Sequence, residues 1–403
     1  MLPTLDRYSH RVVALIVFAA GATIASAQTP YFPAPGAGWE HRKPEQVGLT
    51  AKAVDSAVVL ALASEATTPR DLLANHKQSF GREPFGEATG PFRDRGGAAG
   101  LIVRRGYIVA EWGDPARVDI TYSVTKSFVT TTVGLAYDRK MIRDIKDPVR
   151  GYMAPIITMR GMTSEVLMPF ESDHNRKITW EHLLRQTSDW QGTLWGKPDW
   201  ADRFPRNASD TAAVINRARH EPGTVYTYND VRVNLMALAS LNVWRRPLPQ
   251  VLKEFVMDPI GASNSWRWAG YDNSWVVMDG QMVQSVAGGA HWGGGMMISA
   301  HDMARFGYLT LRNGKWGSKQ LISEEWIKQS RSPGPANSGY GFANYFLNRD
   351  KKAMPNAPET AFYHSGNGAN LVYVDPVNDL VIVSRWTNIR ALDAMVKVIT
   401  AKP

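Results

Sequence analysis

The sequence predicts a mixed α/β protein of the α+β type, in which a mostly antiparallel sheet flanked by helices is built from both ends of the chain. Two observations carry this prediction: β-rich runs occur near residues 98–113 and again after about residue 340, whereas helical spacing dominates between them. A third is composition, since 44% hydrophobic and 21% charged residues are typical of a globular protein. We therefore assign 28–140 together with 331–403 to a mixed α/β lobe, and 141–330 to a helix-rich second lobe.

The first 27 residues have the features of a secretory signal peptide. Arg7 and Arg11 precede the apolar run "VVALIVFAAGATIA", whose 14 residues are too few to cross a bilayer. The small-residue pattern Ala25-Ser26-Ala27 follows it and is typical of a cleavage site. We expect a periplasmic or secreted mature chain with no stable membrane insertion; a buried N-terminal helix is the alternative. The chain has no cysteine, which excludes a thiol nucleophile and thiolate metal ligands.

The remaining elements follow from local patterns. A helix is expected over 50–64, capped by Thr50, and a polar loop rich in Gly, Pro and Arg over 66–98, either a lid of a site or a surface insertion. Arg105-Gly106 predicts a hairpin turn, and a helix follows to about Lys140. Four final strands and a closing helix are expected in "YGFANYFLN", "ETAFYHSG", "ANLVYVDP", "DLVIVSRWTN" and "RALDAMVKVITAK".

Charge and motif content exclude several classes of function. The formal net charge is +9, but no run of five Lys or Arg occurs, so no nucleic-acid partner is expected. The basic surface is read as solvated, with attraction to anionic envelope polymers as the alternative. No G-x-S-x-G, H-E-x-x-H, P-loop or dinucleotide motif is present, so we expect no metal and no cofactor.

Ser123 and Lys126 stand three residues apart where an apolar helix is expected to begin. Residues at this spacing share one face of a helix, so the two side chains can touch. Free N–H groups at a helix N-terminus can stabilise an oxyanion, and a buried lysine gives up its proton more easily. Ser123 is therefore a candidate nucleophile and Lys126 its base. A single Ser-x-x-Lys also arises by chance in a chain of this length.

Two later stretches supply further candidates. In "EPGTVYTYNDVRVN", the hydroxyl of Tyr228 could relay a proton to a leaving group; a core tyrosine after a turn is the alternative. In "YHSGNGAN", a strand ends in His364-Ser365-Gly366 and is followed by Asn367. Its glycines would let the strand edge approach a ligand, and an N–H there could pair with that of Ser123 as an oxyanion hole. A glycine-bearing strand end without function is the alternative.

Taken in this order, the motifs resemble those of the serine β-lactamase and penicillin-binding-protein superfamily. The similar branch includes class C β-lactamases, DD-peptidases, D-aminopeptidases, family VIII esterases and 6-aminohexanoate-dimer hydrolases. Its S-x-x-K, Y-x-N and K-T-G or H-x-G motifs correspond to Ser123-Val124-Thr125-Lys126, Tyr228-Asn229-Asp230 and His364-Ser365-Gly366. The resemblance extends from about residue 44 to 390 and implies the β-lactamase/transpeptidase-like fold.

The sequence departs from the family pattern at two positions. Asp230 stands where the family has Asn, and a carboxylate beside Lys126 favours the protonated lysine, which works against its role as base. His364 stands where K-T-G has lysine, as in DD-peptidases, D-aminopeptidases, aminohexanoate hydrolases and some esterases. We expect His364 to border the site and to orient Tyr228 or the substrate.

The resulting prediction is an exported serine hydrolase that cleaves a small ester or amide through a Ser123 acyl-enzyme. Lys126 would act as base, Tyr228 as proton relay, and the N–H groups of Ser123 and Asn367 as the oxyanion hole. Ser365, Gly366 and Asp230 are the further substrate-binding candidates. Alternatives are a β-lactamase, a DD-peptidase or D-aminopeptidase acting on peptide-like substrates, or a penicillin-binding-like protein without turnover. The sequence leaves the substrate and the oligomeric state open.

Overall fold

The computed structural model describes residues 30–401 except 37, 161–162 and 206–209, so the predicted signal peptide lies outside the described residues. Residues from Tyr31 onward form one compact unit. The boundary between the two predicted lobes remains a prediction. The ten α-helices of the described chain are α1 (Ala51–Ala63), α2 (Leu72–Gln78), α3 (Thr125–Asp138), α4 (Trp180–Leu184), α5 (Thr211–Ile215), α6 (Asp230–Trp244), α7 (Leu248–Leu252), α8 (Ala300–Leu311), α9 (Glu324–Ser330) and α10 (Ile389–Thr400).

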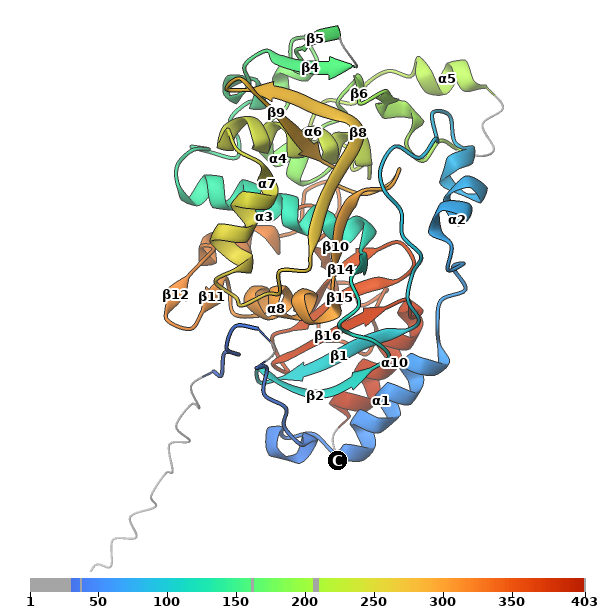
Figure 1. The fold of residues 1–403 in the computed structure, drawn as a ribbon, viewed down its shortest axis with the longest axis vertical. Helices are drawn as coiled ribbons and strands as arrows, with labels where there is room; N and C mark the ends of the chain where they lie inside the picture. Colours follow the sequence, from blue (N-terminus) through green and yellow to red (C-terminus); the bar gives the residue numbers. More distant parts are fainter. Residues whose placement is uncertain (1–29, 37, 161–162, 206–209, 402–403) are drawn as a thin grey trace, which may run out of the picture. The chain divides into compact units, whose positions relative to one another are not determined.

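A six-stranded antiparallel sheet joins the two ends of the chain, as the sequence predicts (Figure 1). In order across the sheet, its strands are β13 (Phe346–Leu347), β14 (Phe362–Gly366), β15 (Asn370–Asp375), β16 (Leu380–Arg385), β1 (Ala99–Arg104) and β2 (Tyr107–Trp112). Helices α1 and α10 pack together against one face through a shared apolar cluster, and α8 covers the other face. The mixed α/β prediction with a mostly antiparallel sheet is therefore confirmed.

Local signals explain the elements that were predicted correctly. Helix α1 begins where the Thr50 hydroxyl accepts a hydrogen bond from the Ala53 N–H. The β1–β2 hairpin turns at Arg105 and Gly106, which have φ angles of 52° and 88°. Two consecutive positive φ angles are the requirement of the tight hairpin turn that matches strand twist, and glycine meets it without strain.

The structure corrects two expectations and adds a sheet to the region 141–330. The segment 66–98 is not a plain loop, because Asp71 caps the short helix α2 inside it. The first of the four expected final strands, in "YGFANYFLN", is only the two-residue strand β13. The region 141–330 holds most of a second antiparallel sheet besides its helices. That sheet consists of β3 (Asp119–Ile120), β10 (Gly295–Ile298), β8 (Arg267–Met278), β4 (Ile156–Arg160) and β5 (Thr163–Leu167), with β9 (Gln281–Val286) also paired to β8.

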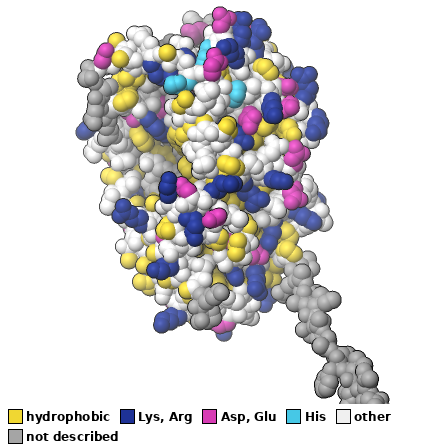
Figure 2. Space-filling view, turned by 180° about the vertical axis from the view of Figure 1, so that it is seen from behind, with side chains coloured by type: hydrophobic (Ala, Val, Ile, Leu, Met, Phe, Trp, Pro, Cys, Tyr) yellow, Lys and Arg dark blue, Asp and Glu magenta, His cyan; other side chains and the backbone are white. Residues whose placement is uncertain are grey.

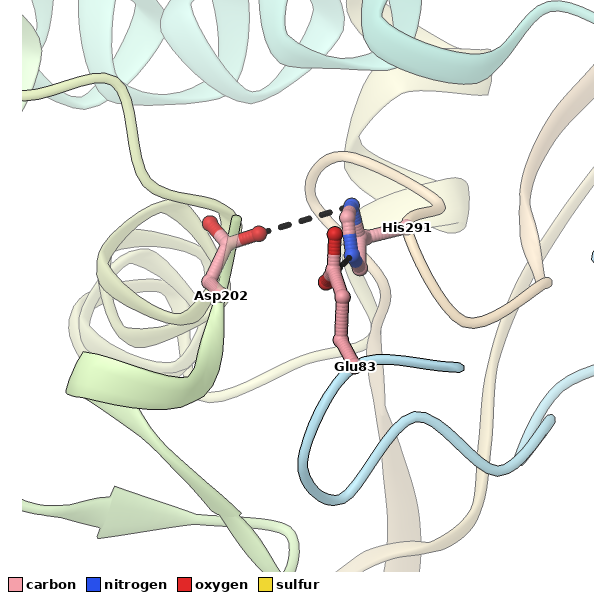
Figure 3. Close-up of side chains that lie close together, drawn as sticks. All are labelled: Glu83, Asp202 and His291. Atoms are coloured by element: carbon pink, nitrogen blue, oxygen red, sulfur yellow. Dashed lines mark hydrogen bonds and ion pairs between the residues drawn. The ribbon is translucent and has the colours of Figure 1, made fainter. Parts of the chain in front are cut away.

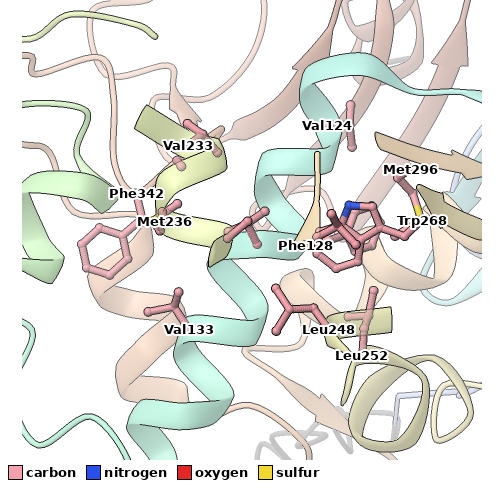
Figure 4. Packing of buried hydrophobic residues seen from close by; sticks show 14 of the residues in the cluster. Val124, Phe128, Val133, Val233, Met236, Leu248, Leu252, Trp268, Met296 and Phe342 are labelled. Carbon is pink, nitrogen blue, oxygen red and sulfur yellow. The ribbon is translucent and has the colours of Figure 1, made fainter. Parts of the chain in front are cut away.

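The core around α3 fixes the position of the predicted Ser-x-x-Lys motif. Val124, just before α3, and Phe128, in its first turn, lie among side chains of α6, α7, β8 and β10 (Figure 4). Twelve consecutive α3 residues, from Thr125 to Ala136, are buried. A helix enclosed on all sides cannot shift without loss of packing, so the residues at its N-terminus are held rigidly.

The surface view shows Lys and Arg side chains interspersed with Asp and Glu rather than gathered into one block (Figure 2). Among the described residues, no helix combines the length and the apolar character needed to cross a bilayer. The expected absence of a nucleic-acid partner remains a prediction.

Glu111 on β2 accepts hydrogen bonds from His41, at 2.8 Å, and from His301 on α8. The hydrogen bond with His301 lowers the pKa of Glu111 most, and the one with His41 lowers it less. Burial alone would raise this pKa, but the net result is a value of about 2. A carboxyl whose pKa is lower in the folded state stabilises the fold above its unfolded pKa, and this stability is lost as the pH falls from about 4.5 to about 2.

We therefore expect Glu111→Gln to lower the free energy of unfolding by about 0.5 to 1 kcal/mol at pH 6 and by clearly less at pH 3. Chemical denaturation of both proteins at the two pH values measures this difference. An equal loss at both pH values would mean that Glu111 acts through packing rather than through its charge.

Candidate active site

Ser123 lies in a single 3₁₀ turn, Tyr122–Val124, between β3 and α3. Tyr122 adopts a left-handed φ of 46°, which is uncommon for a residue with a side chain and turns the chain sharply before the helix. As a result Ser123 is only half-buried, although the two residues on either side of it are buried. The Nζ atom of Lys126 donates a hydrogen bond of 2.8 Å to Ser123 Oγ. The two side chains expected to touch are thus in contact.

Lys126 is fully buried and has two further neighbours. Its Nζ lies 2.7 Å from Asp230 Oδ1 and 4.6 Å from the ring centroid of Tyr228. Asp230 is the first residue of α6, where the Asn229 side chain caps the helix by accepting a hydrogen bond from the Arg232 N–H. The Tyr-Asn-Asp motif is therefore the start of a helix, and it brings Tyr228 and Asp230 to Lys126.

Asp230 remains ionised in this environment. Burial alone would raise the pKa of Asp230, but Lys126 and then Arg203 hold it well below its usual range. The carboxylate and the lysine are both less than 2% exposed, so their attraction is weakly screened. This is the arrangement that was expected to oppose the release of a proton by Lys126.

His364 lies deeper than predicted. Its ring is fully buried among aromatic side chains of the core, and its Nδ1 is 2.9 Å from Ser127 Oγ and 3.1 Å from the Asn344 carbonyl oxygen. None of the contacts described for this ring reaches Tyr228, and the expectation that His364 orients Tyr228 or the substrate remains a prediction. Burial lowers the pKa of His364 to about 4, which leaves the ring neutral at pH 7. Its contact with Ser127 joins β14 to α3 one residue beyond Lys126.

The end of β14 approaches the backbone of the Ser123 turn closely. A Cβ atom on Gly366 would lie 2.1 Å from the Thr121 carbonyl oxygen and 3.3 Å from the Ser123 backbone nitrogen. Only glycine fits at this distance, as the sequence argument for a close strand edge requires. Ser365 is half-buried, and Asn367 is exposed just past the strand end.

Asn344 connects the Ser123 turn to β14, and no motif predicted this role. Its side-chain amide donates to the Ser123 carbonyl oxygen, and its Oδ1 accepts a 3.0 Å hydrogen bond from the Ser365 backbone N–H. A single side chain therefore clamps the turn that carries Ser123 to β14.

A second group that the sequence did not predict surrounds Asp230. Arg203 Nη2 lies 3.3 Å from Asp230 Oδ1, and Arg203 also pairs with Asp202. Beyond Asp202 lies His291, which contacts Glu83 in the segment 66–98 (Figure 3). These residues come from three distant stretches of chain, and no short motif contains them.

Glu83, Asp202 and His291 are the one set within the described residues whose ligand atoms could converge on a metal ion. In the structure they form a cluster in which His291 hydrogen-bonds to Glu83 and lies within ion-pair distance of Asp202. Each carboxylate meets a different nitrogen of the imidazole ring, and Asp202 is already bound by Arg203 through both oxygens.

The order and geometry of these motifs agree with a sequence comparison. Residues 85–390 match the profile of the Beta-lactamase family, which is more than half of the chain. The chain belongs to the beta-lactamase family. Members of this family are serine hydrolases, and the chain is accordingly a beta-lactamase-related hydrolase. The resemblance inferred from the three motifs is thus confirmed.

Solved structures of low sequence identity share the beta-lactamase fold. A family VIII carboxylesterase superposes with a TM-score of 0.54 at 17% identity, over 86% of this chain and 96% of its own. A penicillin-binding protein homologue from Caulobacter crescentus has a TM-score of 0.53 and 13% identity, over 87% of this chain and 98% of its own. A protein from Bacteroides dorei, provisionally named a beta-lactamase, has a TM-score of 0.54 and 15% identity, over 75% of this chain and 92% of its own.

One curated sequence is similar over a shorter stretch. A protein of Escherichia coli O157:H7, provisionally named D-alanyl-D-alanine carboxypeptidase, is 21% identical over 216 residues, or 45% of this chain. The match spans about half of that relative, 49% of its length. The solved structures share their fold with the chain, and their names and that of the Escherichia coli relative state different activities.

Proposed function

We propose that this chain is an exported serine hydrolase that cleaves a small ester or amide through an acyl-enzyme on Ser123. The observation that supports it most is the 2.8 Å hydrogen bond between Ser123 Oγ and the buried Lys126 Nζ at the start of α3. A nucleophile and base within hydrogen-bond distance are the geometric requirement for covalent catalysis. Export rests on the predicted signal peptide of residues 1–27.

In the acylation step, the free amine of Lys126 takes the hydroxyl proton of Ser123 while Oγ forms a bond to the substrate carbonyl carbon. The carbonyl electrons move onto oxygen, and the backbone N–H groups of Ser123 and Asn367 stabilise the resulting oxyanion. When this intermediate collapses, the bond to the leaving oxygen or nitrogen breaks. The proton held by Lys126 passes through the Tyr228 hydroxyl to that leaving atom.

In the second step, water gives a proton to the same base and its oxygen bonds to the acyl carbon. The bond to Ser123 Oγ then breaks, Ser123 regains its proton, and the carboxylic acid leaves. We assign His364 a positioning role rather than a place beside the substrate, because its neutral buried ring holds β14 against α3. Ser365 and Gly366 would then present the strand edge to the substrate.

A second candidate is hydrolysis of β-lactams or of peptidoglycan-like peptides with the same residues. The provisional name of the Escherichia coli relative favours the peptide substrate. A third candidate is a binding protein that becomes acylated but does not release the acyl group. The Asp230–Lys126 pair favours this candidate, because Asp230 stabilises the ammonium form of Lys126.

The test compares p-nitrophenyl butyrate with a chromogenic cephalosporin, using residues 28–403 and the Ser123→Ala variant. We expect ester cleavage that depends on Ser123, little cephalosporin turnover, and an acyl adduct located by mass spectrometry on the peptide that contains Ser123. Faster turnover of the cephalosporin than of the ester would favour a β-lactamase. A stable adduct without turnover would favour the binding protein. Undiminished cleavage by Ser123→Ala would overturn the proposal.

A further inference from the structure

Asp230 places a negative charge beside the lysine that must release its proton, and Arg203 contacts the same carboxylate oxygen. Asp230 Oδ1 lies 2.7 Å from Lys126 Nζ and 3.3 Å from Arg203 Nη2. One oxygen is therefore shared by two cations. We propose that Arg203 is a positioning residue that supplies the counter-charge of Asp230, so that Asp230 can hold Lys126 in place without fixing a proton on it. The inference rests on the proposed function, in which Lys126 acts as the base.

Arg203 is held in the orientation that this role requires. Its Nη1 lies 2.7 Å from each carboxylate oxygen of Asp202, and its backbone N–H donates to Glu83 Oε2 at 3.3 Å. Asp202 in turn accepts a hydrogen bond from the backbone N–H of Asp230. The contacts form a closed loop in which Asp202 fixes both the guanidinium and the first residue of α6. Arginine suits this position better than lysine, because the two terminal nitrogens of one planar guanidinium can contact two carboxylates at once.

Arg203 also lies against the proposed proton relay. The centre of its guanidinium is 4.7 Å from the Tyr228 ring centroid, a distance close to the 4.6 Å of Lys126 Nζ. A third of the Arg203 side chain is exposed, whereas Lys126 and Asp230 are enclosed. Arg203 is thus the outermost member of the charged group around Asp230, between the buried pair and solvent.

Arg203 divides its two terminal nitrogens between the two carboxylates, with Nη1 on Asp202 and Nη2 on Asp230. Complete burial raises the pKa of Asp202, although Arg203 and His291 oppose this shift, so the carboxyl is held less firmly as an anion than Asp230. Burial alone would lower the pKa of Arg203, but Asp202 and Asp230 hold it above its usual range, so the guanidinium stays charged. The charged and titratable groups around the pair are Lys126, Arg203, Asp230, Asp202, His291, Glu83, Tyr226, Tyr228, Tyr271 and Tyr340.

The outer contacts anchor this group to the segment 66–98. His291 Nε2 lies 2.8 Å from Glu83 Oε2, and its Nδ1 lies 3.4 Å from Asp202 Oδ1 (Figure 3). Both the ring and the Asp202 carboxylate are fully buried. The orientation of Arg203 therefore depends on a layer of contacts that is itself enclosed, as a positioning group requires.

The test is a double-mutant cycle of Arg203→Met and Asp230→Asn, with kcat/KM for p-nitrophenyl butyrate measured against pH. In the wild-type background, we expect Arg203→Met to lower kcat/KM at pH 7 at least tenfold and to move the rising limb of the pH profile about one unit higher. The cause is the uncompensated Asp230 carboxylate, which holds the proton on Lys126. In the Asp230→Asn background, the same change should cost less than about threefold and leave the limb in place.

Two further variants separate this role from folding. Arg203→Lys restores the charge and should restore the wild-type pH limb, even if kcat/KM recovers only in part. Arg217→Met breaks another arginine–aspartate pair, with Asp189, which lies outside the Asp230 group, and should leave the limb unchanged. If Arg203→Met alone does not fold, the Arg203→Lys variant and the double variant, in which residue 230 no longer carries a carboxylate, decide the question.

Equal losses from Arg203→Met in both backgrounds, or an unmoved pH limb, would overturn the inference. The proposed function would survive that result as long as Ser123→Ala abolished turnover. Undiminished turnover by Ser123→Ala would overturn the proposed function itself, whatever the Arg203 variants did.

Discussion

Replacing Lys126 by methionine is expected to lower kcat/KM about 10²- to 10⁴-fold and to lower the free energy of unfolding by about 3 kcal/mol. The activity falls because methionine keeps the length of the side chain but cannot accept the proton of Ser123. The stability falls because Asp230, less than 2% exposed, loses the nearer of its two cations. Kinetics with p-nitrophenyl butyrate and denaturant unfolding at pH 7 measure the two effects.

The double variant Lys126→Met with Asp230→Asn separates these two losses. It removes the buried anion together with its partner, so we expect most of the stability to return while the activity stays lost. Recovery of activity in the double variant would show that Lys126 is not the base. Full stability in the single variant would show that Arg203 alone can balance Asp230.

The parts of the site that the sequence predicts are those encoded locally. Ser123 and Lys126 meet because a 3₁₀ turn continuing into α3 brings residues three apart onto one face. Tyr228 precedes Asn229, whose side chain caps α6, and a cap is readable from the residue types at a helix start. Gly366 could be predicted as a point of close approach because glycine is the residue that permits it.

The rest of the site depends on contacts between distant segments. Arg203 contacts Asp230, which is 27 residues away in the sequence, and Glu83 contacts His291, which is 208 residues away. No local sequence pattern indicates such pairs. The burial of His364 could not be predicted either. Strand β14 lies next to the edge strand β13 but is buried at four of its five residues, so its sequence does not show which side chains face the core.

The second sheet was missed for a related reason. Strand β8 alternates irregularly in burial over its 12 residues, so its period resembles neither a clean strand nor a helix. The turn Asp279-Gly280, with φ angles of 51° and 77°, was the available signal of the β8–β9 hairpin. Two tryptophans of this region, Trp266 and Trp268, pack into the core, whereas Trp275 on β8 is exposed (Figure 4 shows Trp268).

Gly289→Ala is the second change for which we expect a large effect, although Gly289 contacts no substrate in the proposed mechanism. A Cβ atom there would lie 2.2 Å from Asp230 Oδ2 and 2.4 Å from Lys126 Nζ. Real Cβ atoms do not approach other heavy atoms this closely, so the buried pair must move. Displacement of a base by about 1 Å costs on the order of 10²-fold in rate, and overpacking costs about 1 to 3 kcal/mol of stability.

Gly151→Ala is the matched control, because a Cβ atom at Gly151 meets nothing within 4 Å and its φ is not positive. We expect it to leave kcat/KM unchanged and to alter the free energy of unfolding by less than about 0.5 kcal/mol. If Gly289→Ala destabilised the protein but left kcat/KM unchanged, the Asp230–Lys126 pair would be a structural feature apart from the chemistry. A loss of rate in Gly289→Ala that exceeds its loss of folded protein, measured by active-site titration, ties the position of this pair to turnover.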